Sequence, residues 1–155
     1  MFSKLQYGVM AGMLALSVGA GVAYAAMSAD DAIKARKACM KMGHAGVMKV
    51  AVPILKGDAK FDAAALKAAF DAEDAACKDW AMWWGPDTQK GVKEETHALP
   101  AIWTDPKGFE AAGAAWYAAD QKLRAATDEA SFKAAFPAVG DGCKGCHEKF
   151  RAAMQ

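Results

Sequence analysis

Two cysteines and a histidine lie close together near the carboxyl end of the chain, in the order Cys143-Lys144-Gly145-Cys146-His147. Each of the two thiols, three positions apart, could form a thioether with the edge of a porphyrin, and the histidine that follows would then lie beneath its iron. The spacing therefore predicts one haem c, attached covalently through Cys143 and Cys146, with His147 as its proximal ligand.

Two other kinds of site use the same spacing of two cysteines. A Cys-x-x-Cys pair also occurs in thiol redox enzymes and as half of a structural zinc site. The first expects a strand-helix-strand setting, the second needs another pair of ligands at a compatible spacing, and neither pattern surrounds Cys143. The histidine directly after the second cysteine favours haem attachment over both alternatives.

Residues 1–25 have the features of an export signal. Lys4 gives a positive start, an apolar run follows, and Ala23-Tyr24-Ala25 fits a small-x-small cleavage site. The run is shorter than the ~20 residues of a membrane span, which favours a cleaved signal over an anchor and predicts no span after cleavage. Without Lys4, the remaining basic residues balance the 18 acidic ones, so the charge gives no indication of nucleic-acid binding. We expect a periplasmic protein, because haem attachment in bacteria takes place outside the cytoplasm.

Residues 26–155 are expected to form one all-α domain, because alanine and lysine are abundant and β-branched residues are sparse. Apolar residues recur at helical spacing in four stretches, which predict helices at 29–55, about 62–84, about 105–123 and 129–153. Pro137 and the glycines after it predict a break in the last helix. Four amphipathic helices of this length predict an antiparallel four-helix bundle that encloses the haem.

These features together resemble the class II c-type cytochromes, the cytochrome c′ family, over essentially all of residues 26–155. The resemblance rests on Arg36-x-x-x-Met40, Lys56-Gly57 followed by Phe61-Asp62, Pro100 to Trp103, and Cys143 to Arg151. The stretch between Met40 and Pro53 is about one residue longer than the family pattern. The resemblance implies a four-helix bundle with the haem motif near its carboxyl end, and a tendency to form homodimers through the first two helices.

Met40 is the candidate for the second axial ligand. It lies on the apolar stripe of the first helix, and the first and last helices of an up-down bundle are neighbours, which would bring Met40 toward His147. The alternative is that Met40 only fills the core. The resemblance implies either a ligand or a bulky blocker at this place. His44, on a neighbouring face, and His97, in a loop, are expected at the surface.

Arg36 and Arg151 are candidates for binding the haem propionates. Arg36 lies one turn before Met40, and Arg151 lies one turn after His147. An arginine on a core stripe is costly without an anionic partner, and a propionate is such a partner. The alternatives are that Arg36 reaches the surface and that Arg151 is solvated; the resemblance favours the propionate for Arg36. Packing roles alone are expected for Trp80, Trp84, Trp103 and Trp116.

Cys39 and Cys77 are not needed for haem attachment. They lie equally far along the sequence from the turn at Asp58, so two antiparallel helices would bring them to the same height. Export would expose them to an oxidising compartment. A disulfide and a pair of free buried thiols both fit this pattern.

Two functions compete. The leading hypothesis is an electron carrier whose single haem iron cycles between Fe(III) and Fe(II), bound by His147 and Met40, and which exchanges electrons with periplasmic redox proteins. The alternative is a five-coordinate haem protein that binds nitric oxide or carbon monoxide. No nucleophilic or proton-transfer group accompanies the motif, so we do not expect an enzyme.

Overall fold

A computed structural model describes residues 27–153, so the predicted export signal lies outside the described part of the chain. The helices are α1 (Ala29–Ala38), the π-helix η1 (Cys39–His44), α2 (Ala45–Lys56), α3 (Ala63–Cys77), the 3₁₀ helices η2 (Trp80–Trp84) and η3 (Pro86–Thr88), α4 (Ala101–Thr104), α5 (Pro106–Arg124) and α6 (Glu129–Phe150). Within residues 27–153 the only β pairing is an isolated bridge between Ala98 and Arg151. None of the helices described is long and apolar enough to cross a membrane.

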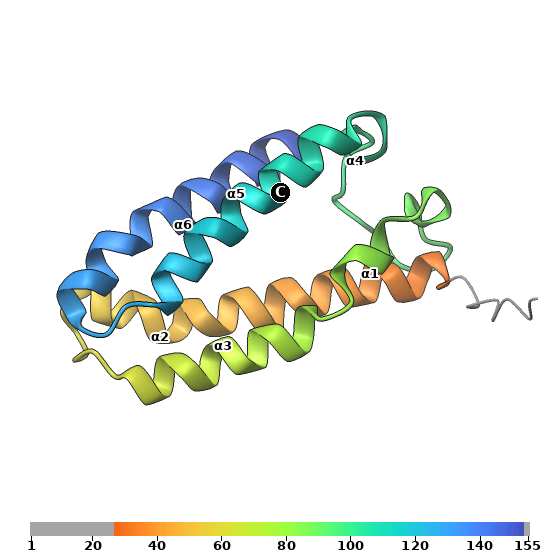
Figure 1. The fold of residues 1–155 in the computed structure, drawn as a ribbon. Helices are drawn as coiled ribbons and strands as arrows, with labels where there is room; N and C mark the ends of the chain where they lie inside the picture. The colour runs from red at the N-terminus through yellow and green to blue at the C-terminus, as the bar shows by residue number, and fades with distance from the viewer. Residues whose placement is uncertain (1–26, 154–155) are drawn as a thin grey trace, which may run out of the picture.

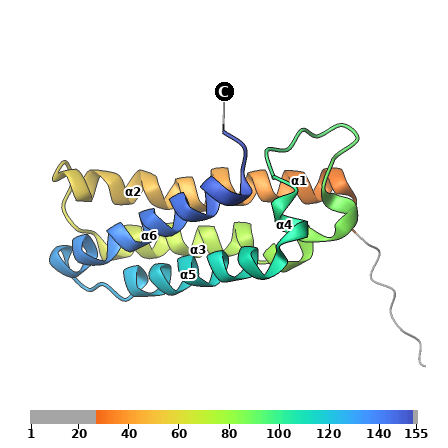
Figure 2. The same cartoon turned by 90° about the horizontal axis from the view of Figure 1, so that it is seen from above.

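The segments α1, η1 and α2 follow one another as a single long helix, which forms an antiparallel four-helix bundle with α3, α5 and α6 (Figure 1). The predicted all-α bundle is therefore confirmed. Figures 1 and 2 place the α2–α3 and α5–α6 turns at one end of the bundle and the long connection between α3 and α5 at the other. The haem-binding motif lies in the last turns of α6, near this second end.

Side chains at the helix starts fix where three of these helices begin. The carboxylate of Asp62 accepts hydrogen bonds from the backbone N–H groups of Ala64 and Ala65, and Asp105 accepts one from Gly108, with Pro106 in the first helical position. Asp128 caps α6 in a reciprocal arrangement with Ser131. These contacts satisfy N–H groups that have no partner inside a helix.

The end of the bundle with the two short turns is filled by apolar side chains. The buried members of this cluster are Val47, Ala51, Ile54, Leu66, Phe70, Leu123, Phe132 and Val139. The cluster draws on all four long helices, so it holds the bundle together away from the haem motif. At about 25 cal/mol per Å² of apolar area, this burial is the main stabilising term of the fold.

The predicted break near Pro137 is wrong, because α6 is continuous from Glu129 to Phe150. Pro137 is exposed and interrupts the hydrogen bonding only locally. Gly142 lets α6 approach α5 closely, since a Cβ at this position would lie 3.1 Å from the Cα of Trp116. Packing along α5 thus outweighs the low helix propensity of this stretch.

Two other helix ends differ from the sequence prediction. The second helix ends as an α-helix at Cys77, and the tryptophans from Trp80 onward lie in the 3₁₀ helix η2. The last helix ends at Phe150, where the carbonyl of Phe150 accepts from Leu99 and the Ala152 N–H donates to the carbonyl of His97. This pairing ties the chain after the haem motif to the long connection.

The π-helix η1 adds a residue to the first helix. The Ala45 N–H donates to the carbonyl of Met40, five residues back instead of four. A π turn holds more residues than an α turn, and it lies at the start of the stretch that is about one residue longer than the family pattern. Cys39 and Gly43 are buried in this turn, whereas Met40 is half-buried.

Asp30 ties the long connection to the start of α1. Its carboxylate accepts hydrogen bonds from the backbone N–H groups of Val92, Lys93 and Glu94. These donors, led by Glu94, hold the pKa of Asp30 below its ordinary value of 3.8. The ionised form is therefore the one that binds the loop.

We expect Asp30→Ala to be less stable than the wild type at neutral pH and to lose this deficit in acid. Because the pKa of Asp30 is depressed in the folded state, its contribution to the free energy of unfolding is present above the pKa of the unfolded state. The contribution is lost as the pH falls through the pKa of the folded state. Urea unfolding of both proteins at a series of pH values measures the difference. Asp58→Ala, at an exposed turn, is the control, and a deficit of Asp30→Ala that stays constant well below pH 3.8 would contradict the assignment.

Candidate functional site

A cavity of about 1240 Å³ lies at the end of the bundle that holds the haem motif. It exceeds the roughly 300–1,000 Å³ of ordinary small-molecule pockets, as a macrocyclic cofactor requires. Side chains from η1, α3, η2, α4, α5 and α6 line it, among them Met40, Trp80, Trp84, Trp103, Phe109, Trp116, Cys143, Cys146 and His147. The four tryptophans expected only to pack therefore also form the cavity wall.

The three residues of the motif line one side of this cavity. Cys143 and Cys146 are free thiols, half-buried, and burial raises the pKa of both. Burial lowers the pKa of His147, and the nearby Arg151 charge lowers it further. The imidazole is thereby kept neutral, which is the form that binds a metal.

Met40 lies on the wall of the same cavity as His147. Met40 comes from η1 and His147 from α6, so the structure brings the two candidate axial ligands to one space from two different helices. Met40, Cys143, Cys146 and His147 thus line one cavity; ligation of the iron by Met40 stays a prediction.

Arg36 is buried and does not reach the surface, so the alternative of a solvated Arg36 is wrong. Its Nε and Nη2 donate to the carbonyl of Trp83, and Nη2 also donates to the Thr88 hydroxyl at 2.5 Å. The guanidinium lies 4.1 Å from the centroid of a Trp84 ring. Burial lowers the pKa of Arg36 to about 10. The arginine remains a cation enclosed by aromatic rings.

Three buried side-chain nitrogens lack an acceptor within residues 27–153, namely Arg36 Nη1, Trp84 Nε1 and Arg151 Nε. All three are N–H donors, and a buried donor without an acceptor costs about 1–3 kcal/mol. Acceptor oxygens on a bound group would remove this cost, and the propionates of haem carry such oxygens. Of the three residues only Trp84 lines the cavity, whereas Arg36 and Arg151 are not part of its wall. The fit to a haem therefore rests on the aromatic-walled cavity, the two thiols and the neutral imidazole.

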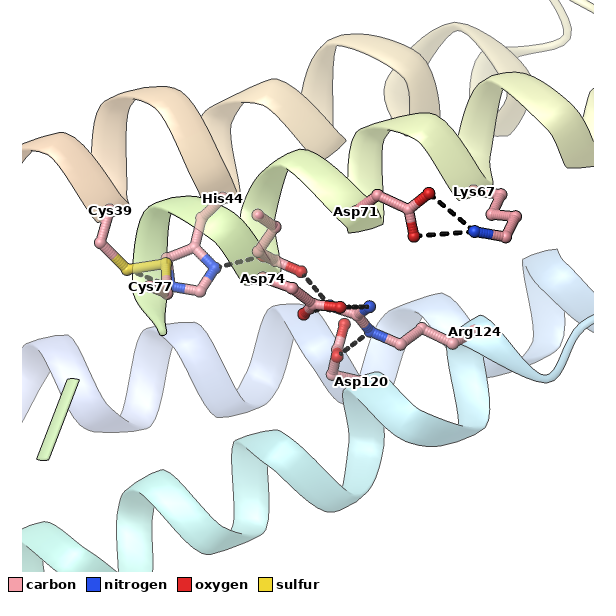
Figure 3. A network of polar contacts seen from close by, with 9 residues as sticks. Cys39, His44, Lys67, Asp71, Asp74, Cys77, Asp120 and Arg124 are labelled. Atoms are coloured by element: carbon pink, nitrogen blue, oxygen red, sulfur yellow. Dashed lines mark hydrogen bonds and ion pairs between the residues drawn. A yellow bond between two sulfur atoms is a disulfide. The ribbon is translucent and has the colours of Figure 1, made fainter. Parts of the chain in front are cut away.

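A cluster of charged residues lies on another part of the cavity wall (Figure 3). The expectation that His44 lies at the surface is wrong. Its Nδ1 lies 2.5 Å from Oε1 of Glu73, and its ring packs edge-on against Trp116. Arg124 donates to Glu73 at 2.6 Å and to Asp120 at 2.5 Å. Glu73 and Asp120 are carboxylates on otherwise apolar stripes, and this sequence pattern indicates that cationic partners lie nearby.

A disulfide joins Cys39 of η1 to Cys77 at the end of α3 (Figure 3). The alternative of two free thiols is therefore wrong. Both cysteines line the cavity, and Nε2 of His44 lies 3.6 Å from the Sγ of Cys39. His97, by contrast, is exposed as expected.

Known proteins show the same sequence pattern and fold. The family described as Cytochrome C′ matches residues 31–151. Cytochrome c′ of Rhodopseudomonas palustris is 36% identical over 151 residues, which cover 96% of this chain and 97% of that protein. Cytochrome c-556 of the same species is 31% identical over 147 residues, which cover 92% of this chain and 94% of that protein.

Solved structures agree with these sequence relatives. The crystal structure of cytochrome c′ from Rubrivivax gelatinosus superimposes with a TM-score of 0.71 at 33% identity, covering 81% of this chain and 98% of that one. A nitric oxide complex of a leucine-to-isoleucine variant of cytochrome c prime from Alcaligenes xylosoxidans gives 0.69 at 32% identity, with 81% and 98% coverage. In both sequence and fold, the chain belongs to the cytochrome c′ family of haem proteins.

Proposed function

We propose that this protein is a single-haem electron carrier with His147 and Met40 as axial ligands and Cys143 and Cys146 as the points of covalent attachment. The observation that carries the proposal is that Met40 and His147 line one cavity from two helices. When bound, haem supplies a reversible one-electron couple between Fe(III) and Fe(II) at its iron. A carrier of this kind exchanges electrons without turning over a substrate, so the proposal does not include an enzymatic activity.

The side chains around the cavity have separate tasks in this proposal. His147 offers a neutral imidazole, and the thioether of Met40 is a neutral, polarizable ligand that raises the reduction potential. Aromatic side chains such as Trp80 and Phe109 exclude water, which favours the less charged, reduced state. Propionate binding by Arg36 and Arg151 stays a prediction: each has a buried N–H donor without an acceptor within residues 27–153, and neither residue lines the cavity.

A second candidate function is the binding of nitric oxide or carbon monoxide. It is favoured by relatives of known structure that are described as nitric oxide complexes. Met40 would then crowd, without bonding, the space in which the gas binds. The two candidates differ only in whether the Met40 thioether is a ligand, so one residue distinguishes them.

We expect Met40→Ala to convert the ferric holoprotein from a low-spin to a high-spin spectrum and to abolish the sulfur-to-iron charge-transfer band. If Met40 occupies the sixth position about nine-tenths of the time, its removal raises the apparent affinity of the ferrous protein for carbon monoxide about tenfold. Visible spectra and carbon monoxide titration measure both effects. Met48→Ala, in α2 and also half-buried, is the matched control. A wild-type spectrum that is already high-spin and unchanged by Met40→Ala would overturn the carrier in favour of the gas binder.

We further propose that the protein works in the periplasm with redox proteins as partners. This location rests on the predicted export signal at residues 1–25 and on the need to attach haem outside the cytoplasm. A homodimer through the first two long helices, which the family resemblance implies, stays a prediction that light scattering of the holoprotein would test.

A further inference from the structure

Met40 lies in the only π-helical segment within residues 27–153. Such segments are rare because their hydrogen-bond pattern is less favourable than that of an α-helix, so they persist where surrounding contacts hold them. One residue of an α-helix turns the side-chain direction by about 100°. If η1 relaxed to an α-helical pattern, the side chains that follow η1 in the chain would have to turn by about this angle relative to those that precede it.

A disulfide fixes η1 immediately before Met40. Cys39 is fully buried and is joined to Cys77, the last residue of α3. Because the bond is to the residue adjacent to Met40, it restrains the backbone at the point where the methionine side chain begins. Figure 3 shows the disulfide between the two helices, beside the imidazole of His44.

Two further contacts fix η1 after Met40. Gly43 approaches α3 so closely that a Cβ at this position would lie 3.0 Å from the Sγ of Cys77 and 3.3 Å from the Cα of Glu73. His44 pairs with Glu73 at 2.5 Å. The side chain of Glu73 is itself only 4% exposed and is held from α5 by Arg124. Met40 is therefore bracketed by attachments to α3 on both sides.

We propose that the Cys39–Cys77 disulfide and the close approach of Gly43 to α3 are a positioning device for Met40. They hold the π turn in place, so that the methionine thioether stays directed into the cavity shared with His147. This inference rests on the proposed role of Met40 as a ligand. Its physical basis is that ligating groups work only when held within about 0.5 Å of the productive geometry, and a free helical turn does not hold a four-atom side chain so closely.

The test is the double variant Cys39→Ser/Cys77→Ser, prepared as the haem-loaded protein. We expect part of the ferric population to become high-spin, the midpoint potential to fall, and the apparent affinity of the ferrous form for carbon monoxide to rise severalfold. Leu66→Ala is the control, since Leu66 is buried on α3 in the apolar cluster at the other end of the bundle. It should lower the unfolding midpoint and leave spectrum and potential unchanged.

A Met40→Ala background separates this inference from the proposed function. If Met40→Ala alone leaves the spectrum unchanged, the proposed axial role fails, and the positioning device fails with it. If Met40→Ala has its expected effect but Cys39→Ser/Cys77→Ser leaves spectrum and potential at wild-type values, only the positioning device is overturned. If the device exists, removing the disulfide in the Met40→Ala protein causes no further spectral change.

Gly43→Ala gives a second test that keeps the disulfide. Its new methyl group would press against Cys77 and Glu73, so η1 must shift away from α3. The same direction of change in spin state and potential is expected. Should the double cysteine variant fail to fold, an unaltered spectrum of Gly43→Ala would by itself overturn the proposal.

Discussion

Replacing both Cys143 and Cys146 with alanine is expected to leave a protein without covalently bound haem. The two thiols are the only free cysteines in the described chain, since Cys39 and Cys77 are joined to each other. A thioether needs a thiol at the right place, and the cavity wall offers no other. Mass spectrometry of the variant should show the polypeptide alone, and acid-acetone extraction should remove all colour.

The haem-free variant is also expected to lose cooperative unfolding. Its cavity of about 1240 Å³ would have no covalently held occupant. Cavity creation costs about 24 cal/mol per Å³, and domains are stable by only about 5–15 kcal/mol, so a void of this size cannot persist in a compact bundle. Calorimetry should show a broadened or absent transition in place of a single cooperative one.

The matched control is Cys39→Ser/Cys77→Ser, which also removes two cysteines and should retain the mass of one haem. Single replacements of Cys143 or Cys146 should retain one thioether. A wild-type protein whose mass equals that of the polypeptide, or a double alanine variant that keeps its haem in acid acetone, would refute covalent attachment at these residues.

Local rules of sequence were enough for the helix starts and for the haem motif. Asp62 and Asp105 cap helices because an aspartate before an apolar stripe satisfies free N–H groups, whatever the rest of the chain does. Cys143, Cys146 and His147 share one helical segment, so their mutual placement follows from helical spacing alone. Cys39 and Cys77 lie equally far from a turn in sequence, which predicted that they are neighbours. This left a disulfide and a pair of free buried thiols as the two alternatives.

Contacts between distant parts of the chain decided what the sequence did not reveal. A constant helical period cannot represent η1, where one additional residue shifts the face on which later side chains lie. Helix α6 continues through Pro137 because α5 packs along it at Gly142. His44 is partly buried because Glu73, far away in sequence, accepts its hydrogen bond. The residues next to His44 in sequence, Gly43 and Ala45, give no sign of such a partner.

Arg124 is the cation at the centre of the buried charged cluster (Figure 3). Its guanidinium pairs with Glu73, Asp120 and Asp74 and lies 4.4 Å from the ring centroid of Phe70. The carboxylates of Glu73 and Asp120 are only 4% and 3% exposed. Two buried acids thus depend on one arginine for their principal countercharge.

We expect Arg124→Met to lower the free energy of unfolding at neutral pH by about 3–5 kcal/mol, because removing one partner leaves buried charges uncompensated. Methionine keeps much of the apolar contact with Phe70, so the loss reports mainly the charge. Lys67→Met is the control: Lys67 pairs with Asp71 on the surface, with side chains 76% and 61% exposed. An exposed pair of this kind contributes at most about 1 kcal/mol. Urea unfolding of the three haem-loaded proteins measures the difference.

The deficit of Arg124→Met should shrink in acid. Burial raises the pKa of Asp120 in the wild type, and the hydrogen bond from Arg124 opposes this rise, so loss of the arginine raises it further. An acid with a raised folded-state pKa binds its proton more readily when folded. The destabilisation that the ionised Asp120 causes is therefore complete above the folded-state pKa. It disappears as the pH falls toward the ordinary value of 3.8. A deficit that is the same at neutral pH and near pH 4, or one no larger than that of Lys67→Met, would show that Arg124 does not neutralise the buried carboxylates.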